Sequence, residues 1–329
     1  MTTEFDLQYT YSASRAKALE SELLNENQLE RLVGAKDMSE ITMVLQDTFL
    51  SDLLPSGGAS VFDLSHLLRK SLSRAKQTIS SIAPDPAILD VLWLRYDYYN
   101  LKTIVKGRRA GLSDEEIIER CFFAAKYDPR VLLDYASTGR LGNLHKEMSV
   151  AYEKALESLT VYGIDVLMNR GYFIHVRKCA VVIDNEFVSD YVAFLTDFFN
   201  LQAQLRLVTL RHLTVPEAFI QGGRFTPSDL DSVEKIYAAF ETFGDAFLWT
   251  EAIARHRDRG EYLLLQKVMD DYELKFVQEH GRSIFSFVPL FAFFIARRNN
   301  LQIVRTIVTA KQAGMDERDL RVMLRRLYA

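Results

Sequence analysis

Apolar side chains recur at every third or fourth position over most of the chain, which is the spacing of an amphipathic helix. The pattern predicts helices over residues 9–33, from a cap at Ser39 onward, over 63–81 and over 86–107. Only 7 prolines and 15 glycines interrupt 329 residues, and the alternation typical of strands is scarce. The nearest candidate for a strand is the short segment 179–183. We therefore predict an all-α fold.

One helical pattern occurs three times, each copy starting 100 residues after the one before. Each copy follows a segment rich in aromatic and aliphatic residues and continues as an amphipathic helix. A loop and an acidic start of a short helix come next, at 111–116, 214–217 and 314–317. The copies read Asp-Tyr-Tyr-Asn-Leu-Lys at 97–102, Asp-Phe-Phe-Asn-Leu-Gln at 197–202 and Arg-Arg-Asn-Asn-Leu-Gln at 297–302. The pattern indicates three diverged copies of one helical unit.

The repeat divides the chain into helical units 1–138, 139–231 and 232–329. A unit of this size is longer than the helical repeats of solenoid proteins, whose periods are about 20 to 50 residues. We therefore expect each unit to be a small helical domain.

The asparagines of the three copies, Asn100, Asn200 and Asn300, occupy equivalent helix positions. Asparagine costs a few tenths of a kcal/mol, roughly, relative to alanine inside a helix, so a compensating interaction is expected at each place. A hydrogen bond to a neighbouring helix or loop is favoured over contact with a ligand. The sequence therefore predicts three equivalent packing contacts.

The overall composition excludes some classes of protein. A formal net charge of −4 and a pI near 5.9 give no basic surplus for binding nucleic acid. Cys121 and Cys179 are far apart in sequence and are interpreted as small buried thiols. The N-terminus lacks the basic and apolar regions of a signal peptide. The longest uncharged apolar run, 283–296, is shorter than the roughly 20 residues of a membrane span, so we expect a peripheral, cytoplasmic chain.

No combination of residues predicts a catalytic, cofactor or metal site. The 6 histidines are scattered, and none lies three or four residues from another. The pairs Gly57-Gly58 and Gly222-Gly223 lack the Lys-Ser/Thr sequence of a phosphate loop. The segment 270–273, Asp-Asp-Tyr-Glu, is similar to the aspartate pairs that bind magnesium diphosphate in all-helical prenyl-transferring enzymes. Leu274 stands where that motif needs its third acid, so a solvated helix face is favoured.

Basic residues follow the repeated pattern in each copy. Cations are favourable near helix C-termini, which explains the enrichment without a partner. The other interpretation is a surface charged toward a partner, and for it we name Arg108, Arg109 and Arg211 as candidate partner contacts. Both explanations can hold together.

Three stretches carry a resemblance to a known family. They are Tyr-Ser-Ala-Ser-Arg-Ala-Lys at 11–17, Tyr-Asp-Tyr-Tyr-Asn-Leu-Lys at 96–102, and Phe-Phe-Asn-Leu at 198–201 with Arg206. The chain resembles the C subunit of bacterial and archaeal V/A-type rotary ATPases, the relative of the eukaryotic V-ATPase d subunit. The resemblance covers essentially the whole length. The third copy departs from it, because Arg297-Arg298 replaces the Asp-aromatic pair.

The resemblance implies a non-enzymatic funnel of three similar helical domains around a pseudo-threefold axis. Such a funnel sits on the ring of membrane rotor subunits and receives the foot of the central shaft, which is made of subunits D and F. It also implies a peripheral position on the cytoplasmic face of the membrane. The alternative is a cytoplasmic all-helical scaffold or adaptor protein. The sequence leaves open ATP synthesis or hydrolysis, and transport of protons or sodium.

Overall fold

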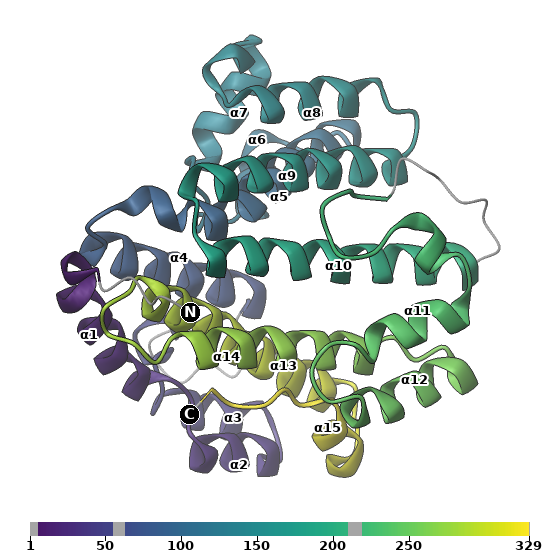
Figure 1. Ribbon diagram of the computed structural model, residues 1–329. Coiled ribbons are helices and arrows are strands. Elements are labelled where there is room, and N and C mark those ends of the chain that lie inside the picture. The colour runs from purple at the N-terminus through teal and green to yellow at the C-terminus, as the bar shows by residue number, and fades with distance from the viewer. Residues whose placement is uncertain (1–5, 55–62, 210–218, 329) are drawn as a thin grey trace. The chain divides into compact units, whose positions relative to one another are not determined.

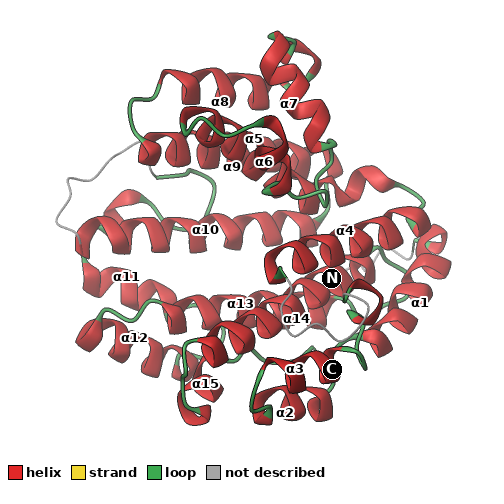
Figure 2. Cartoon of the chain, turned by 180° about the vertical axis from the view of Figure 1, so that it is seen from behind, coloured by secondary structure: helices red, strands yellow, loops and turns green. Residues whose placement is uncertain are grey.

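The computed structural model describes residues 6–54, 63–209 and 219–328. Every regular element in these ranges is a helix, which confirms the all-α class (Figures 1 and 2). The segment 179–183, the nearest candidate for a strand, lies at the end of a helix. The loop at 214–217, which follows the second copy of the repeat, lies outside the described residues.

The chain forms two compact units, one of them discontinuous in sequence. Met1–Pro86 joins Gly244–Ala329 in unit 1, and Ala87–Phe243 forms unit 2. The division into 1–138, 139–231 and 232–329 stays a prediction about the repeat.

Unit 1 is assembled around one long buried helix, α14 (Val288–Gln312). This helix packs against α1, α4 and α13, so both ends of the chain meet along it (Figure 1). Its residues are buried on nearly all sides, as expected of a helix that is apolar all round. The other helices of the unit are α1 (Thr10–Leu19), α2 (Glu26–Gly34), α3 (Met38–Leu45), α4 (Leu64–Ile82), α12 (Phe247–Arg259), α13 (Leu263–His280) and α15 (Glu317–Met323).

Residues 9–33, predicted as one helix, contain two. The break falls before Asn25, which caps α2 by accepting a hydrogen bond from the backbone N–H of Gln28 at 2.9 Å. The Gln28 side chain accepts the Asn25 N–H in return at 3.2 Å, which completes a capping box. Leu23 and Leu24 are buried across the break, so the apolar spacing concealed it. The cap of α3 is Asp37, two residues before the predicted Ser39.

In unit 2 the long helix α9 (Val161–Ile183) packs against both helices that carry a copy of the repeat, α5 (Asp90–Arg109) and α10 (Glu186–Thr209). The closest packing joins α9 to α8 and to α5. The helices are α5 (Asp90–Arg109), α6 (Asp114–Glu119), α7 (Pro129–Thr138), α8 (Lys146–Glu157), α9 (Val161–Ile183), α10 (Glu186–Thr209) and α11 (Val233–Phe240). The segment predicted as one helix over 86–107 contains a short 3-10 turn, Pro86–Leu89, followed by α5.

A histidine lies in the core between α5, α8 and α9. His175 is 5% exposed, and its Nδ1 lies 3.3 Å from the hydroxyl of Tyr98. The ring of His145 stacks on it with 3.7 Å between ring centroids. Burial, followed by the neighbouring His145, lowers the pKa of His175 from 6.5 to about 3.

We expect this histidine to make unit 2 sensitive to mild acid. The unfolded chain binds a proton at His175 below pH 6.5 or so, whereas the folded protein keeps it neutral. The free energy of unfolding therefore falls as pH drops through about 6.5, by about 2 kcal/mol at pH 5. Urea unfolding at pH 7 and pH 5 measures the loss. Between pH 7 and pH 5, the free energy of unfolding of the His175→Gln variant should fall by about 2 kcal/mol less than that of the parent. An equal fall in both proteins would show that His175 is not the source of the acid sensitivity.

Candidate functional site

The first copy of the repeat holds a loop through two buried side chains of α5. The side-chain amide of Asn100 donates to the carbonyl of Phe122 at 2.8 Å and accepts the N–H of the same residue at 2.8 Å. One turn earlier, the carboxylate of Asp97 accepts the N–H groups of Lys126 and Tyr127 at 3.1 and 2.9 Å. Two side chains of one helix thus fix the loop that follows α6.

The second copy repeats this arrangement on α10. Asn200 donates to the carbonyl of Ile220 at 2.7 Å and accepts its N–H at 2.9 Å. Asp197 accepts the backbone N–H of Arg224 at 2.8 Å and its Nε–H at 3.1 Å. The backbone at Gly223 lies so close that an added Cβ would meet the Asp197 carboxylate at 2.0 Å. Burial raises the pKa of Asp197, and the contacts with Arg224 oppose this.

The two arrangements share one geometry. In each, an asparagine amide pairs with both backbone groups of a single loop residue, and an aspartate three residues earlier binds the loop four positions further on. We call this arrangement the loop clamp: Asp97 and Asn100 form the first, and Asp197 and Asn200 the second. The packing role predicted for Asn100 and Asn200 is confirmed. The role of the aspartates was missed, although their constant spacing before each asparagine was the available signal.

The third copy does not form a loop clamp, so the packing role predicted for Asn300 is wrong. Asn300 is fully buried, and neither atom of its amide has a hydrogen-bond partner among the described residues. Its neighbour Asn299 instead donates to the carbonyl of Arg326 at 2.8 Å. The N–H of Arg326 is bound by Asp271 on α13 at 2.9 Å. The asparagine contact with the loop is thus made one residue earlier, by Asn299 of α14. The loop N–H is bound by a different helix, α13.

Arg297 stands in α14 where the other copies have aspartate. Its guanidinium donates to Glu22 at 3.0 Å and lies 3.9 Å from the centre of the Phe49 ring. The arginine is 5% exposed, and burial lowers its pKa, against the effect of Glu22. The buried charge is thus balanced by one carboxylate and by the rings of Phe49 and Phe293, the latter at 5.2 Å. The third copy therefore joins α14 to the N-terminal segment.

The aspartate pair of 270–273 is not a solvated face. Asp270 accepts from Arg325 at 2.7 Å, and Asp271 is paired with Lys267 at 3.0 Å while it binds the N–H of Arg326. Burial raises the pKa of Asp271, and Lys267 opposes this. These carboxylates hold the C-terminal segment against α13. The expectation of a hydrated surface is therefore wrong, and the pair has a structural role.

Of the three candidate partner contacts, two lie within the described residues and both touch their own unit. Arg108 donates to the Ser137 hydroxyl at 2.5 Å and lies 3.5 Å from Asp114. Arg109 donates to the carbonyls of Ala155 and Leu156, at 3.2 and 2.8 Å, at the end of α8. Both side chains remain exposed. Arg211, the third candidate, lies outside the described residues.

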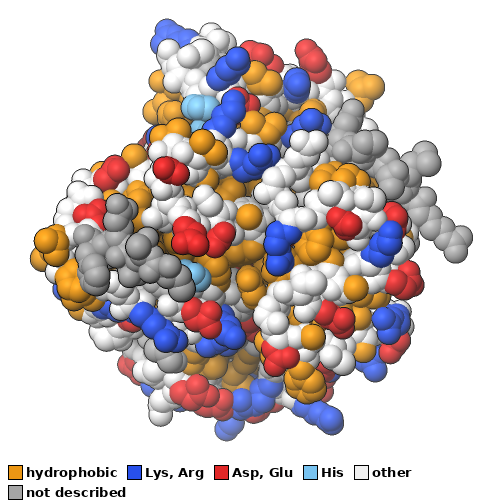
Figure 3. Space-filling view, in the orientation of Figure 1, with side chains coloured by type: hydrophobic (Ala, Val, Ile, Leu, Met, Phe, Trp, Pro, Cys, Tyr) orange, Lys and Arg blue, Asp and Glu red, His pale blue; other side chains and the backbone are white. Residues whose placement is uncertain are grey.

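Other cations of α5 also have internal partners. Lys106 and Lys102 both approach Asp165 of α9, at 2.7 and 3.3 Å. Burial lowers the pKa of Lys102, whereas Asp165 acts to raise it. On the face seen in Figure 3, Lys and Arg are interspersed with Asp and Glu. Basic residues of α5 thus join α5 to its neighbours within unit 2.

Within the described residues, no group of three or more histidine, cysteine, aspartate or glutamate side chains is placed to hold a metal ion. Cys121 is buried, Cys179 is half-buried, and both are free thiols. None of the helices in the described ranges combines the length and apolar character needed to cross a bilayer.

Comparison with known proteins defines the class. The family model described as ATP synthase (C/AC39) subunit matches residues 13–323, so the chain belongs to that family. It is 22% identical over 316 residues to the C subunit of the V-type sodium ATPase of Enterococcus hirae, which covers 94% of this chain and 95% of that protein. It is also 22% identical over 335 residues to the C subunit of the A-type ATP synthase of Haloferax volcanii, with 93% and 94% covered. The corresponding protein of Methanocaldococcus jannaschii is 20% identical over 360 residues, with 96% and 86% covered.

The loop clamps make a prediction about stability. The variants Asn100→Leu and Asn200→Leu keep the side-chain volume but leave a buried N–H and C=O without partners. We expect each to lower the free energy of unfolding by about 2 to 4 kcal/mol. Chemical denaturation, followed by circular dichroism, measures the loss.

Asn300→Leu is the matched control. It removes an amide that has no partner among the described residues, so it should leave the stability unchanged or raise it by about 1 kcal/mol. A loss of stability as large as that of Asn200→Leu would mean that Asn300 has a hydrogen-bond partner in solution. It would contradict the conclusion that the third copy lacks a loop clamp.

Proposed function

We propose that this chain is the non-catalytic coupling component of a V/A-type rotary ATPase or ATP synthase, and that it connects the central shaft of subunits D and F to the membrane rotor ring. The observation that carries the proposal is the match of residues 13–323 to the family model. Relatives that are C subunits of such complexes match over nearly their whole length, which supports it. In this role the chain acts on the cytoplasmic face of the membrane, as a peripheral part of the complex.

A coupling component bears a large mechanical load. One elementary charge that crosses about 150 mV releases about 3.5 kcal/mol, so a few ions per step load the joint with on the order of 10 kcal/mol. That energy equals the binding free energy of a micromolar to nanomolar complex. The interface therefore needs a broad contact between units that do not deform. Helices tied to their loops by buried side chains are suited to this demand, which supports the proposal.

We further propose that the repeat builds a seat of three similar helical domains with pseudo-threefold symmetry. The support is the loop clamp, because on both α5 and α10 an asparagine amide pairs with the N–H and the C=O of a single loop residue. The contacts of Arg297 and Asn299 in the third copy differ, so that domain would be the most diverged.

Co-purification tests the role directly. A tagged copy of the chain, expressed in cells that contain the other subunits, should bring down subunits D and F and the ring subunits. Recovery of soluble partners without any of these subunits would favour an adaptor protein and overturn the proposal.

Charge reversal tests the predicted contacts with the shaft. The triple variant Arg108→Glu, Arg109→Glu and Arg211→Glu should weaken binding of the D and F pair by about tenfold or more at low salt. The effect should shrink at high salt, because screening weakens charge pairs at a rim. Titration of the shaft pair at two ionic strengths measures it.

The controls separate lost contact from lost structure. Arg109 binds carbonyls of α8, so helix content must be compared by circular dichroism. Arg120→Glu reverses one exposed arginine at the end of α6 and should leave shaft binding unchanged. Equal binding by the triple variant and the parent at every salt concentration contradicts the electrostatic contact.

A further inference from the structure

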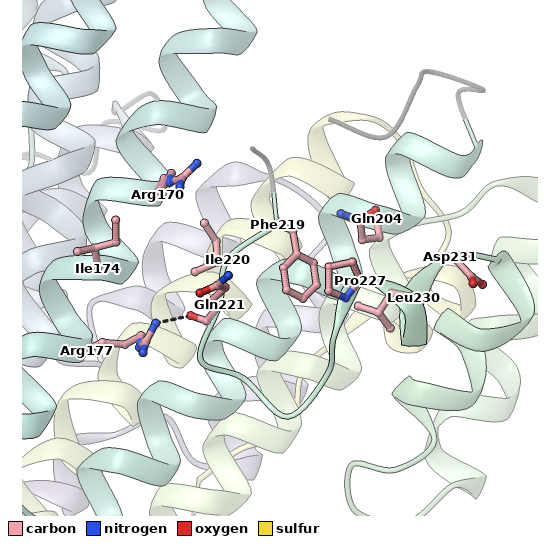
Figure 4. A pocket seen from close by; sticks show the side chains of 10 residues that line it. All are labelled: Arg170, Ile174, Arg177, Gln204, Phe219, Ile220, Gln221, Pro227, Leu230 and Asp231. Atoms are coloured by element: carbon pink, nitrogen blue, oxygen red, sulfur yellow. Dashed lines mark hydrogen bonds between the residues drawn. The ribbon is translucent and has the colours of Figure 1, made fainter. Parts of the chain in front are cut away.

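Unit 2 contains a pocket between two of its long helices. Its volume is about 440 Å³, within the range of small-molecule sites, and it is bounded by α9, α10 and the segment that begins at Phe219 (Figure 4). The side chains of α9 form one wall. Gln204 of α10, Phe219 and Leu230 lie on the other side, as Figure 4 shows.

The wall formed by α9 carries two positive charges that no carboxylate neutralises. Arg170 and Arg177 lie two turns apart, about 10 Å along the helix. Among the described residues, neither guanidinium has an ion-pair partner. The acid at the rim, Asp231, is already paired with Lys235 at 2.8 Å. The pocket therefore has an excess of positive charge and favours an anion.

Arg177 is held in place by the neighbouring loop. One guanidinium nitrogen donates to the carbonyl of Gln221 at 2.6 Å. Gly222 has a φ of +107°, and an added Cβ there would meet the guanidinium carbon at 2.4 Å. Only glycine lets the loop lie so close to the arginine. The single bond to a carbonyl leaves other N–H groups of this guanidinium available for an anion.

The opposite side of the pocket suits a flat ring. Phe219 and Leu230 provide apolar contact, and an aromatic ring can stack on Phe219. Gln204 is 7% exposed, and its amide makes no hydrogen bond to any described residue. A glutamine amide offers both a donor and an acceptor, and this combination matches the edge of an adenine base.

We propose that this pocket binds an adenine nucleotide, with the phosphates on Arg177 and Arg170 and the base against Phe219 and Gln204. Guanidinium groups bind phosphate oxygens through paired, charge-assisted hydrogen bonds. A lipid phosphate shares that chemistry, but a pocket of this size with a buried amide favours a base over acyl chains. The site lies within unit 2 and does not depend on the proposed coupling role.

Isothermal titration calorimetry of the full chain tests the proposal. ADP should bind with a Kd of about 0.1 to 1 mM, because the pocket is open to solvent. Adenosine and pyrophosphate, which each fill one end of the site, should each bind at least about tenfold more weakly. Dihexanoyl phosphatidic acid tests the lipid alternative. Tighter binding of that lipid than of ADP overturns the assignment of a base.

Variants assign the two ends of the site. Arg177→Met and Arg170→Met keep the length of the side chain without its charge, and each should weaken ADP binding by about tenfold. Arg120→Met, which removes an exposed arginine elsewhere in unit 2, should bind ADP like the parent. Gln204→Leu should weaken ADP and leave pyrophosphate unaffected.

Two results overturn the nucleotide site. The first is the absence of any ADP binding at 5 mM, a concentration about fivefold above the weakest expected Kd. The second is a Kd for ADP that changes no more in Arg170→Met and Arg177→Met than in the control Arg120→Met. Circular dichroism of each variant confirms that it is folded, and Arg170→Met alone suffices for the test because that side chain is exposed.

Discussion

The described structure of unit 2 depends on one interaction, the pairing of a buried side-chain amide with the backbone of a loop. A loop that is partly buried against a helix carries N–H and C=O groups that need partners. The side-chain amides of Asn100 and Asn200 each donate to the C=O and accept the N–H of one loop residue. In a sheet, a neighbouring strand would provide such a pair of hydrogen bonds. The aspartate one turn earlier binds the backbone N–H four positions further along the loop. These hydrogen bonds hold the loop against its helix.

The third copy shows what happens when the aspartate is replaced. A carboxylate can accept backbone N–H groups, whereas the guanidinium of Arg297 cannot, because it has no acceptor. Arg297 instead pairs with Glu22, which lies 275 positions away in the sequence. The last segment is held by Asn299 and by carboxylates of α13. The same helix pattern thus ties the two ends of the chain together and gives unit 1 many contacts of long sequence separation.

Most of the basic residues after the first copy act within their own unit. Lys102 and Lys106 share Asp165, and Arg109 binds the last carbonyls of α8. Charges used in this way contribute to helix packing, and each exposed pair contributes little. Arg170 and Arg177 differ, because no carboxylate of the described residues meets either one. Basic residues with internal partners hold helices together, whereas basic residues without a carboxylate partner are available to bind a ligand. Counting basic residues in the sequence does not separate the two.

The sequence by itself determined the fold class, the position of the repeat and the packing role of two of its asparagines. These follow from local rules, since the period of apolar residues and the spacing of the repeat do not depend on distant parts of the chain. Only the tertiary structure decided the partners of Asp97 and Asp197, the pairing of Asp270 and Asp271 with basic residues, and the absence of a loop clamp at Asn300. Those features depend on which segments meet in space. A one-residue shift along a helix turns a side chain by about 100°, and no local pattern reveals which neighbour it then faces.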